Sequence, residues 1–171
     1  MGAVTDDEAA QAIDDFWQLT RGRAWLSTLG GVLGETPAAT VPPPAWAFGD
    51  TPELADELLA LVLDGTKSAT ADLLWSYQAV DEPVPAVGGL SIVLDGSGAP
   101  RALLRTTKVD VVPYSAVTAE HARLEGEGDR TLASWRAEHE QYFRRTLPSG
   151  RTFSDDVPVV CERFTVLYPK R

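Results

Sequence analysis

The sequence has few of the residues that build disulfide scaffolds and metal sites. Its 171 residues include one cysteine, Cys161, and two histidines, His121 and His139. One cysteine cannot form a disulfide within the chain, and one cysteine with two histidines is a poor ligand set for structural zinc. These counts exclude a small disulfide-built secreted domain. We expect no metal and no other cofactor.

Long apolar runs are also absent. No run approaches the roughly 20 residues that a membrane-spanning helix needs. The first residues are acidic, whereas a signal peptide starts with basic and then apolar residues. We therefore expect a cytoplasmic protein with no membrane partner. Because 44% of the residues are hydrophobic, the chain can bury one ordinary core, and we expect one compact domain with an appendage.

Positive charge is scarce and unevenly placed. Fifteen Lys and Arg residues stand against 25 Asp and Glu, which gives a net charge of -10. This negative net charge disfavours nonspecific binding of a polyanion, so we expect no binding of duplex DNA. Residues 1–100 carry 15 acids and three bases (net -12), and residues 101–171 carry ten acids and twelve bases (net +2). The second half can therefore offer a local basic face, either as a ligand contact or as ordinary solvated surface.

The amino-terminal part reads as a helical extension followed by a linker. Apolar residues at spacings of three, four and seven predict a helix over Asp6 to Leu29, with a break allowed at Gly22. We expect it to pack through Trp17 and Trp25. Prolines in residues 36–44 predict a linker. The predicted organisation is an extension over residues 1–45 and a domain over residues 46–171.

The rest of the chain mixes short helices and strands. Leu54, Leu58, Leu61 and Val62 make one apolar face of a predicted helix over Pro52 to Asp64, which Gly65 ends. Short segments with strand character follow Lys67, above all residues 90–94. These residues and residues 102–112, joined by a turn, predict a β-hairpin. Further predictions are helices over 118–125 and 132–145 and a strand over 157–168. The second of these helices carries Trp135, His139, Tyr142 and Phe143 on one side. We predict an α+β fold, a small barrel of mostly antiparallel strands with flanking helices.

The segment Gly65–Thr70 (GTKSAT) looks superficially like the end of a phosphate-binding P-loop. That motif needs a preceding strand and an earlier glycine, whereas a predicted helix precedes this segment. Nucleoside triphosphate hydrolysis is therefore disfavoured. A short strand fits better, in which Lys67 and Ala69 face one side and Ser68 and Thr70 the other, although twist or a bulge could bring Lys67 and Thr70 together.

An ordered set of motifs resembles the ASCH domain family of the PUA-like superfamily. The resemblance spans about Trp46 to Tyr168, and the amino-terminal extension resembles that of longer bacterial members. The motifs are Leu63–Thr70 (LDGTKSAT), Val87–Leu94 (VGGLSIVL), Glu125–Asp129 (EGEGD) and Val159–Phe164 (VVCERF). The resemblance implies a PUA-like barrel with a cleft beside Lys67, and a role with RNA or with a modified nucleoside or nucleotide.

One branch of that family hydrolyses the amide of N4-acetylcytidine with a lysine, a threonine three residues later and a distant glutamate. Lys67 and Thr70 match the first two in spacing, and Glu125 is the best candidate for the third. A desolvated lysine can lose its proton and activate a threonine hydroxyl, while a carboxylate orients groups or shuttles protons. The alternative is a solvated lysine, a strand threonine and a surface acid or helix cap.

Other members resemble metal-assisted or metal-dependent ribonucleases, so cleavage of RNA is a second possible activity. Lys67 would then stabilise phosphate charge or assist deprotonation of a 2'-hydroxyl, with Ser154 or Tyr77 as hydrogen-bonding helpers. Trp75 and Tyr77 could stack a base, or could simply cover the core. A third reading is a non-catalytic RNA-binding or adaptor module.

The remaining candidates are charged or polar neighbours of Lys67. Ser68 is a further binding candidate beside it. We expect at least one of Arg105, Arg151 and Arg163 to add positive potential near Lys67, unless these arginines form surface salt bridges. The acidic pairs Asp155-Asp156 and Glu127-Asp129 could hold a hard cation, but such pairs are usually surface groups. Cys161, in a predicted strand, is most simply a small buried hydrophobe.

Overall fold

The computed structural model of the protein describes residues 6–27 and 41–170. The contacts between residues divide this part of the chain into two compact units. The first contains residues 6–27, 41–63, 90–105 and 166–170, and the second contains residues 64–89 and 106–165. The predictions for residues 28–40, including the helix end near Leu29 and most of the linker, lie outside the described residues.

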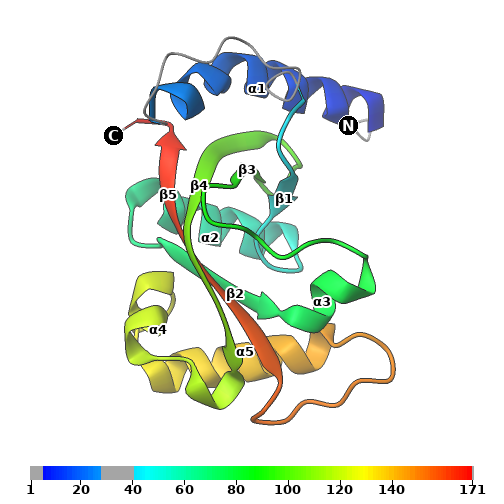
Figure 1. Ribbon diagram of the computed structural model, residues 1–171, viewed down its shortest axis with the longest axis vertical. Coiled ribbons are helices and arrows are strands. Elements are labelled where there is room, and N and C mark those ends of the chain that lie inside the picture. The colour runs from blue at the N-terminus through cyan, green and yellow to red at the C-terminus, as the bar shows by residue number, and fades with distance from the viewer. Residues whose placement is uncertain (1–5, 28–40, 171) are drawn as a thin grey trace. The chain divides into compact units, whose positions relative to one another are not determined.

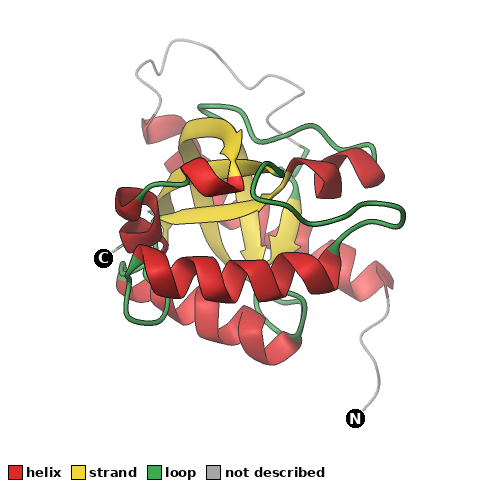
Figure 2. Ribbon diagram, turned by 90° about the horizontal axis from the view of Figure 1, so that it is seen from below, coloured by secondary structure: helices red, strands yellow, loops and turns green. Residues whose placement is uncertain are grey.

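The strands of the described chain form one mixed sheet of order β1-β3-β4-β5-β2 (Figure 1). They are β1 (Ala45–Ala47), β2 (Ala69–Leu73), β3 (Leu90–Leu94), β4 (Pro100–Pro113) and β5 (Pro158–Tyr168). The helices are α1 (Asp6–Ser27), α2 (Pro52–Asp64), α3 (Leu74–Ala79), α4 (Ala119–Glu125) and α5 (Leu132–Thr146), with a short 3-10 helix η2 (Tyr114–Ala116). Figure 2 colours these strands yellow and the helices red.

In the first unit, α1 runs without interruption through Gly22, so the break that the sequence allowed does not occur. Phe16 and Trp17 are buried in an apolar cluster with Ile92 of β3 and Leu103 of β4. This confirms the predicted packing through Trp17, while the side chain of Trp25 lies outside the described set. The helix is therefore anchored by its apolar face, as amphipathic helices generally are.

Helix α2 begins and ends where the sequence predicts. The Thr51 hydroxyl accepts a hydrogen bond from the Leu54 amide over 3.2 Å, which caps the first turn. Gly65 follows the last residue with φ of 85°, a conformation that glycine adopts without strain. Because the chain turns at Gly65, it passes directly from the end of α2 into the segment that carries Lys67.

The hairpin of β3 and β4 is antiparallel, as predicted, with Ile92 opposite Leu103. In contrast, β1 pairs with β3 in parallel, with Trp46 opposite Val93. The sequence places the start of the domain near Trp46 but does not indicate this short strand. The three residues of β1 are too few to show an alternating pattern.

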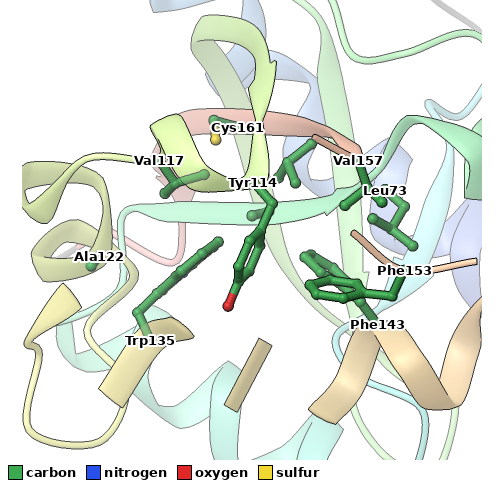
Figure 3. Packing of buried hydrophobic residues seen from close by; sticks show 11 residues of the cluster. Leu73, Tyr114, Val117, Ala122, Trp135, Phe143, Phe153, Val157 and Cys161 are labelled. Atoms are coloured by element: carbon green, nitrogen blue, oxygen red, sulfur yellow. The ribbon is translucent and has the colours of Figure 1, made fainter. Parts of the chain in front are cut away.

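The second unit is built on the antiparallel pair of β2 and β5, in which Ala71 lies opposite Cys161 and Leu73 opposite Val159. Alternate residues of β2 are buried and half-buried, so one face of the strand covers an apolar core. Figure 3 shows that core, in which the Tyr114 ring lies between Trp135 on one side and Phe143 and Phe153 on the other. Aromatic rings from η2, α5 and the loop before β5 thus fill the space that β2 covers.

Helices α4 and α5 have the caps expected of short, well-defined helices. The hydroxyls of Thr118 and Thr131 accept hydrogen bonds from the first turns of α4 and α5 respectively. In α5, Trp135, His139 and Phe143 are buried on one side, as the sequence predicts. Helix α3, by contrast, replaces strand character that we expected after Lys67. It has no side-chain cap and no buried residue, so it leaves no periodic signal.

Candidate functional site

Lys67 lies between α2 and β2, and its side chain is completely buried. The residue that follows it, Ser68, makes two backbone hydrogen bonds within the second unit. The amide of Ser68 donates to the Leu124 carbonyl of α4 over 2.8 Å, and the Ser68 carbonyl accepts from the Phe164 amide of β5 over 3.0 Å. The Lys67 segment is therefore attached to a helix and to a strand, and its long side chain occupies one defined place.

Two carboxylates lie against the Lys67 ammonium. Its Nζ is 3.3 Å from Oε2 of Glu125 and 2.5 Å from Oε1 of Glu127. Glu125 is buried to the same degree as the lysine, whereas the side chain of Glu127 is 19% exposed. A buried charge is tolerated when it is paired and hydrogen-bonded, and this arrangement meets both conditions for Lys67.

Three further side chains contact the Glu125 carboxylate, one through a hydrogen bond and two at ion-pair distance. The Trp135 indole donates to its Oε1 over 2.7 Å. The Nε2 of His139 lies 3.4 Å from Oε2, and the Nε2 of His121 lies 3.0 Å from Oε1. The His121 contact has the distance of an ion pair but not the alignment of a hydrogen bond, and this nitrogen is otherwise without a hydrogen-bond partner. Glu125 is thus the centre of a buried polar cluster.

The charges of this cluster follow from its geometry. His139 presents Nδ1 to the Trp135 carbonyl at 3.0 Å and Nε2 to the Glu125 carboxylate, so both ring nitrogens face acceptors. Burial alone would lower the pKa of His139, but the Glu125 carboxylate outweighs burial and raises this pKa. Burial alone would raise the pKa of Glu125, but the charges of His139 and Lys67 outweigh it and hold this pKa well below its ordinary value. Glu125 is therefore ionised and His139 favours the imidazolium form.

Local sequence explains why these groups meet. His121 and Glu125 are four residues apart in α4, and Trp135 and His139 are four apart in α5, so each pair lies on one helix face. Gly126 ends α4 with φ of 76°, and a Cβ added there would lie 2.6 Å from the Thr66 carbonyl oxygen. Glycine at this position thus permits the close approach that places the Glu125–Glu127 segment on Lys67.

Thr70 and Lys67 lie on different faces of the segment that leads into β2. Ser68, Thr70 and Asp72 are half-buried, whereas Lys67 and the alternate residues of β2 are buried, so Thr70 lies on the strand face away from the aromatic core. Across the pair of β2 and β5 it lies opposite Glu162. Glu162 is 4% exposed and its Oε1 accepts a 2.6 Å hydrogen bond from the Thr106 hydroxyl. Burial raises the pKa of Glu162.

The family model of the ASCH domain matches residues 44–168, which is more than two thirds of the chain. The chain belongs to the ASCH domain family. This is a family linked to RNA binding. The match confirms the resemblance seen in the sequence, whereas the domain boundary near residue 46 stays a prediction.

Solved structures agree with this assignment. A crystal structure of protein EF3133 from Enterococcus faecalis V583 is 33% identical, with a TM-score of 0.77, and the match covers 92% of this chain and 88% of that one. An ASCH domain from Lactobacillus crispatus JV V101 is 28% identical, with a TM-score of 0.72 and coverage of 92% and 98%. No curated protein matches. The predicted α+β, PUA-like fold with flanking helices is confirmed.

Arg151 and Trp75, two residues that the sequence suggests as ligand contacts, are in contact with each other. The Arg151 guanidinium lies over the Trp75 ring, 4.6 Å from its centroid. Tyr77 is half-buried in the same helix as Trp75, and its pKa is raised by burial and by the charges of Asp72 and Glu162. Ser154 is exposed, and its carbonyl accepts a hydrogen bond from the Val157 amide.

The other arginines have different surroundings. Arg163 pairs with Glu120 at 3.1 Å in a salt bridge at the surface, where solvent screens the attraction between the two charges. Arg105 belongs to the first unit, where it lies opposite Leu90 in the hairpin. The ASCH domain therefore places Arg163 in a surface pair.

Within the described part of the chain, no group of three or more His, Cys, Asp and Glu side chains is arranged to hold a metal ion. Of the acidic pairs considered from the sequence, Glu127 contacts Lys67, and Asp129 accepts hydrogen bonds from Thr131 at the start of α5. Burial raises the pKa of the Cys161 thiol to about 12, which fits a small buried hydrophobe. None of the described helices is long and apolar enough to cross a membrane.

The sequence reasoning missed Glu127, His121 and His139 as members of the site. The pairing of Glu127 with Asp129 in the sequence indicates a surface group, and neither His121 nor His139 has a Ser or Cys nucleophile beside it in the sequence. A signal was present nonetheless, because His121 and Glu125 occupy one face of a predicted helix. Ionisable residues on a buried helix face need partners, which is a reason to look for a polar cluster.

Proposed function

We propose that this ASCH-domain protein binds a modified nucleoside, free or within RNA, and hydrolyses an amide on a modified cytidine such as N4-acetylcytidine. The observation that carries this proposal is the buried contact of Lys67 with Glu125 at 3.3 Å. Buried ionisable pairs of this kind are concentrated at catalytic sites, because burial and neighbouring charges adjust proton affinity there. The family's link to RNA binding supports a ligand of nucleoside chemistry.

In this proposal, Lys67 in its neutral amine form takes the proton of the attacking hydroxyl. The bond between the acetyl carbon and N4 breaks, the acetyl group passes to the attacking oxygen, and N4 leaves with a proton. Glu125 is a positioning residue, because its oxygens are held by Trp135, His139 and His121. If the attacking oxygen belongs to water, acetate forms directly; if it belongs to Thr70, a water molecule then hydrolyses the acetyl ester and restores the threonine hydroxyl. In both cases the products are cytidine and acetate.

The nucleophile is either the Thr70 hydroxyl or a water molecule. The spacing of Thr70 from Lys67 supports the first choice, and the place of Thr70 opposite Glu162 supports the second. The variants Thr70→Ala and Thr70→Ser separate the two. Loss of turnover in the alanine variant with retention in the serine variant identifies Thr70, whereas retention in both identifies water.

The Trp75 ring with Arg151 above it supports binding of a nucleobase near this part of the second unit. Aromatic rings and guanidinium planes both stack on bases, and each stacked base contributes about 1–3 kcal/mol. Weaker binding of cytidine by a Trp75→Leu variant would support this role. Unchanged affinity would assign Trp75 to the core alone.

The decisive test is turnover of N4-acetylcytidine by the parent chain and by Lys67→Met. We expect the substitution to lower kcat by at least about 100-fold, the usual contribution of a positioned general base. The matched control is Lys108→Met, since Lys108 is an exposed lysine paired with Asp110. Circular dichroism and thermal unfolding verify the fold of each variant. Shortened RNA without cytidine release would instead indicate a ribonuclease, and saturable binding without either product a binding module.

A further inference from the structure

The members of the Lys67 cluster differ in their contact with solvent. The side chains of Lys67 and Glu125 are 0% and 1% exposed, whereas that of Glu127 is 19% exposed. A lysine that acts as a base must release its proton and regain one in every cycle. Because Nζ itself is buried, that exchange with water requires a route through a neighbouring group.

Glu125 is poorly suited to carry the proton. Its Oε1 accepts from Trp135 and lies beside His121, and its Oε2 lies beside both Lys67 and His139. A carboxylate that accepts hydrogen bonds from Lys67 and Trp135 and lies against two histidines favours its ionised form strongly, so protonation would disturb several interactions at once. Its role is to fix Lys67 in place.

Glu127 has the opposite properties. Its Oε1 is 2.5 Å from the Lys67 Nζ, and part of the same side chain reaches solvent. We propose that Glu127 is the proton relay between the buried Lys67 amine and bulk water. The proton passes from Nζ to the Glu127 carboxylate, which becomes a carboxylic acid and then releases the proton to water. The reverse sequence reprotonates the amine, so charge and protons balance over the cycle.

The charged groups around this route come from three elements. Glu125 and His121 face it from α4, His139 from α5, and Lys67 from the segment before β2. Glu127 itself is held between two glycines with positive φ, 76° at Gly126 and 53° at Gly128. This backbone keeps the carboxylate against Lys67, so the relay operates over one short contact.

Exchange of the Lys67 ammonium hydrogens with water tests the relay directly. The chain has three lysines, Lys67, Lys108 and Lys170, so the spectrum of a protein labelled with 15N-lysine is simple. We expect Glu127→Gln to slow the exchange at Lys67 by at least about tenfold, since a neutral amide cannot accept the proton. Glu127→Asp should keep most of the parent rate. The exposed control Glu140→Gln should leave exchange unchanged.

An exchange rate at Lys67 that is unchanged or faster in Glu127→Gln would overturn the relay. Addition of formate, a small carboxylate, to a folded Glu127→Ala variant provides a second test, because alanine leaves room for formate beside Lys67. The relay predicts that formate partly restores exchange, and no recovery contradicts it. The place of the relay in catalysis rests on the proposed function, but the exchange rate does not. If the parent chain releases no cytidine while exchange still depends on Glu127, the proposed function fails and the relay stands.

Discussion

The indole Nε1 of Trp135 donates a 2.7 Å hydrogen bond to Oε1 of Glu125, ten positions earlier in the chain. The same ring is part of the apolar core of the second unit, where it stacks on Tyr114 and His139. Trp135 therefore links the core to the buried charge cluster. Its ring fixes the position of Glu125, and Glu125 in turn fixes Lys67.

A Trp135→Phe variant separates these two roles. It keeps an aromatic ring in the core and removes the N–H donor, so a buried carboxylate oxygen loses a partner. We expect the free energy of unfolding to fall by about 2–3 kcal/mol, because hydrogen bonds to charged groups are the stronger ones. Urea denaturation measures this. Trp46→Phe, at a ring in edge contact with Phe48, is the control and should cost less.

The imidazolium of His139 makes stability depend on pH. Its pKa is raised in the folded protein, so its contribution is complete below the unfolded value of about 6.5 and is lost as pH rises through the folded value. As the pH rises from about 6 to about 9, we therefore expect the free energy of unfolding to fall more in the parent chain than in His139→Gln. Urea titrations at several pH values give the comparison. Equal slopes for the two proteins would show that His139 is neutral.

We expect an alanine substitution to destabilise the protein more at Gly126 than at Gly150. Both Gly126 and Gly150 have positive φ, 76° and 80°, but only at Gly126 would a Cβ meet backbone, 2.6 Å from the Thr66 oxygen. Gly150→Ala should cost about 1 kcal/mol for its conformation, and Gly126→Ala about 1–3 kcal/mol more as the segment moves from Lys67. Thermal unfolding of both variants checks the difference. Equal losses would mean that the close approach relaxes freely.

Glu162 is a buried acid that the folded state prefers protonated. Its raised pKa means that stability falls as pH rises above the unfolded value of about 4.3 and through the folded value. Glu162→Gln removes this loss and keeps an acceptor for Thr106. We expect the variant to be at least as stable as the parent at neutral pH, with Glu120→Gln at the surface as control. A clear destabilisation by Glu162→Gln at neutral pH would show that the ionised carboxylate is needed.

Local features of the chain were predictable because local physics determines them. The leucine spacing of α2, the hairpin of β3 and β4, and the apolar face of α5 all appear as periodic patterns, and the structure has these elements. Helix α3 and strand β1 were missed because they are six and three residues long, too short for a period to emerge. Aromatic residues in α3 also favour strands in isolation.

The site was predictable only in part. The spacing of Lys67 and Thr70 and the choice of Glu125 came from the family resemblance, and the structure brings Lys67 and Glu125 together. The contact of Lys67 with Glu127 spans 60 positions, and no periodic pattern reports a contact of that kind. The charge of His139 likewise depends on Glu125 and on a backbone carbonyl, which only the folded chain places around it.

The measurement that tests the account most directly is the time course of cytidine and acetate formation from N4-acetylcytidine, quantified by mass spectrometry. We expect cytidine and acetate in equal amounts, at the same rate from the parent chain and from Lys108→Met, and at least about 100-fold more slowly from Lys67→Met. Products formed at the parent rate by a folded Lys67→Met variant, or no cytidine from the parent chain at all, would contradict it.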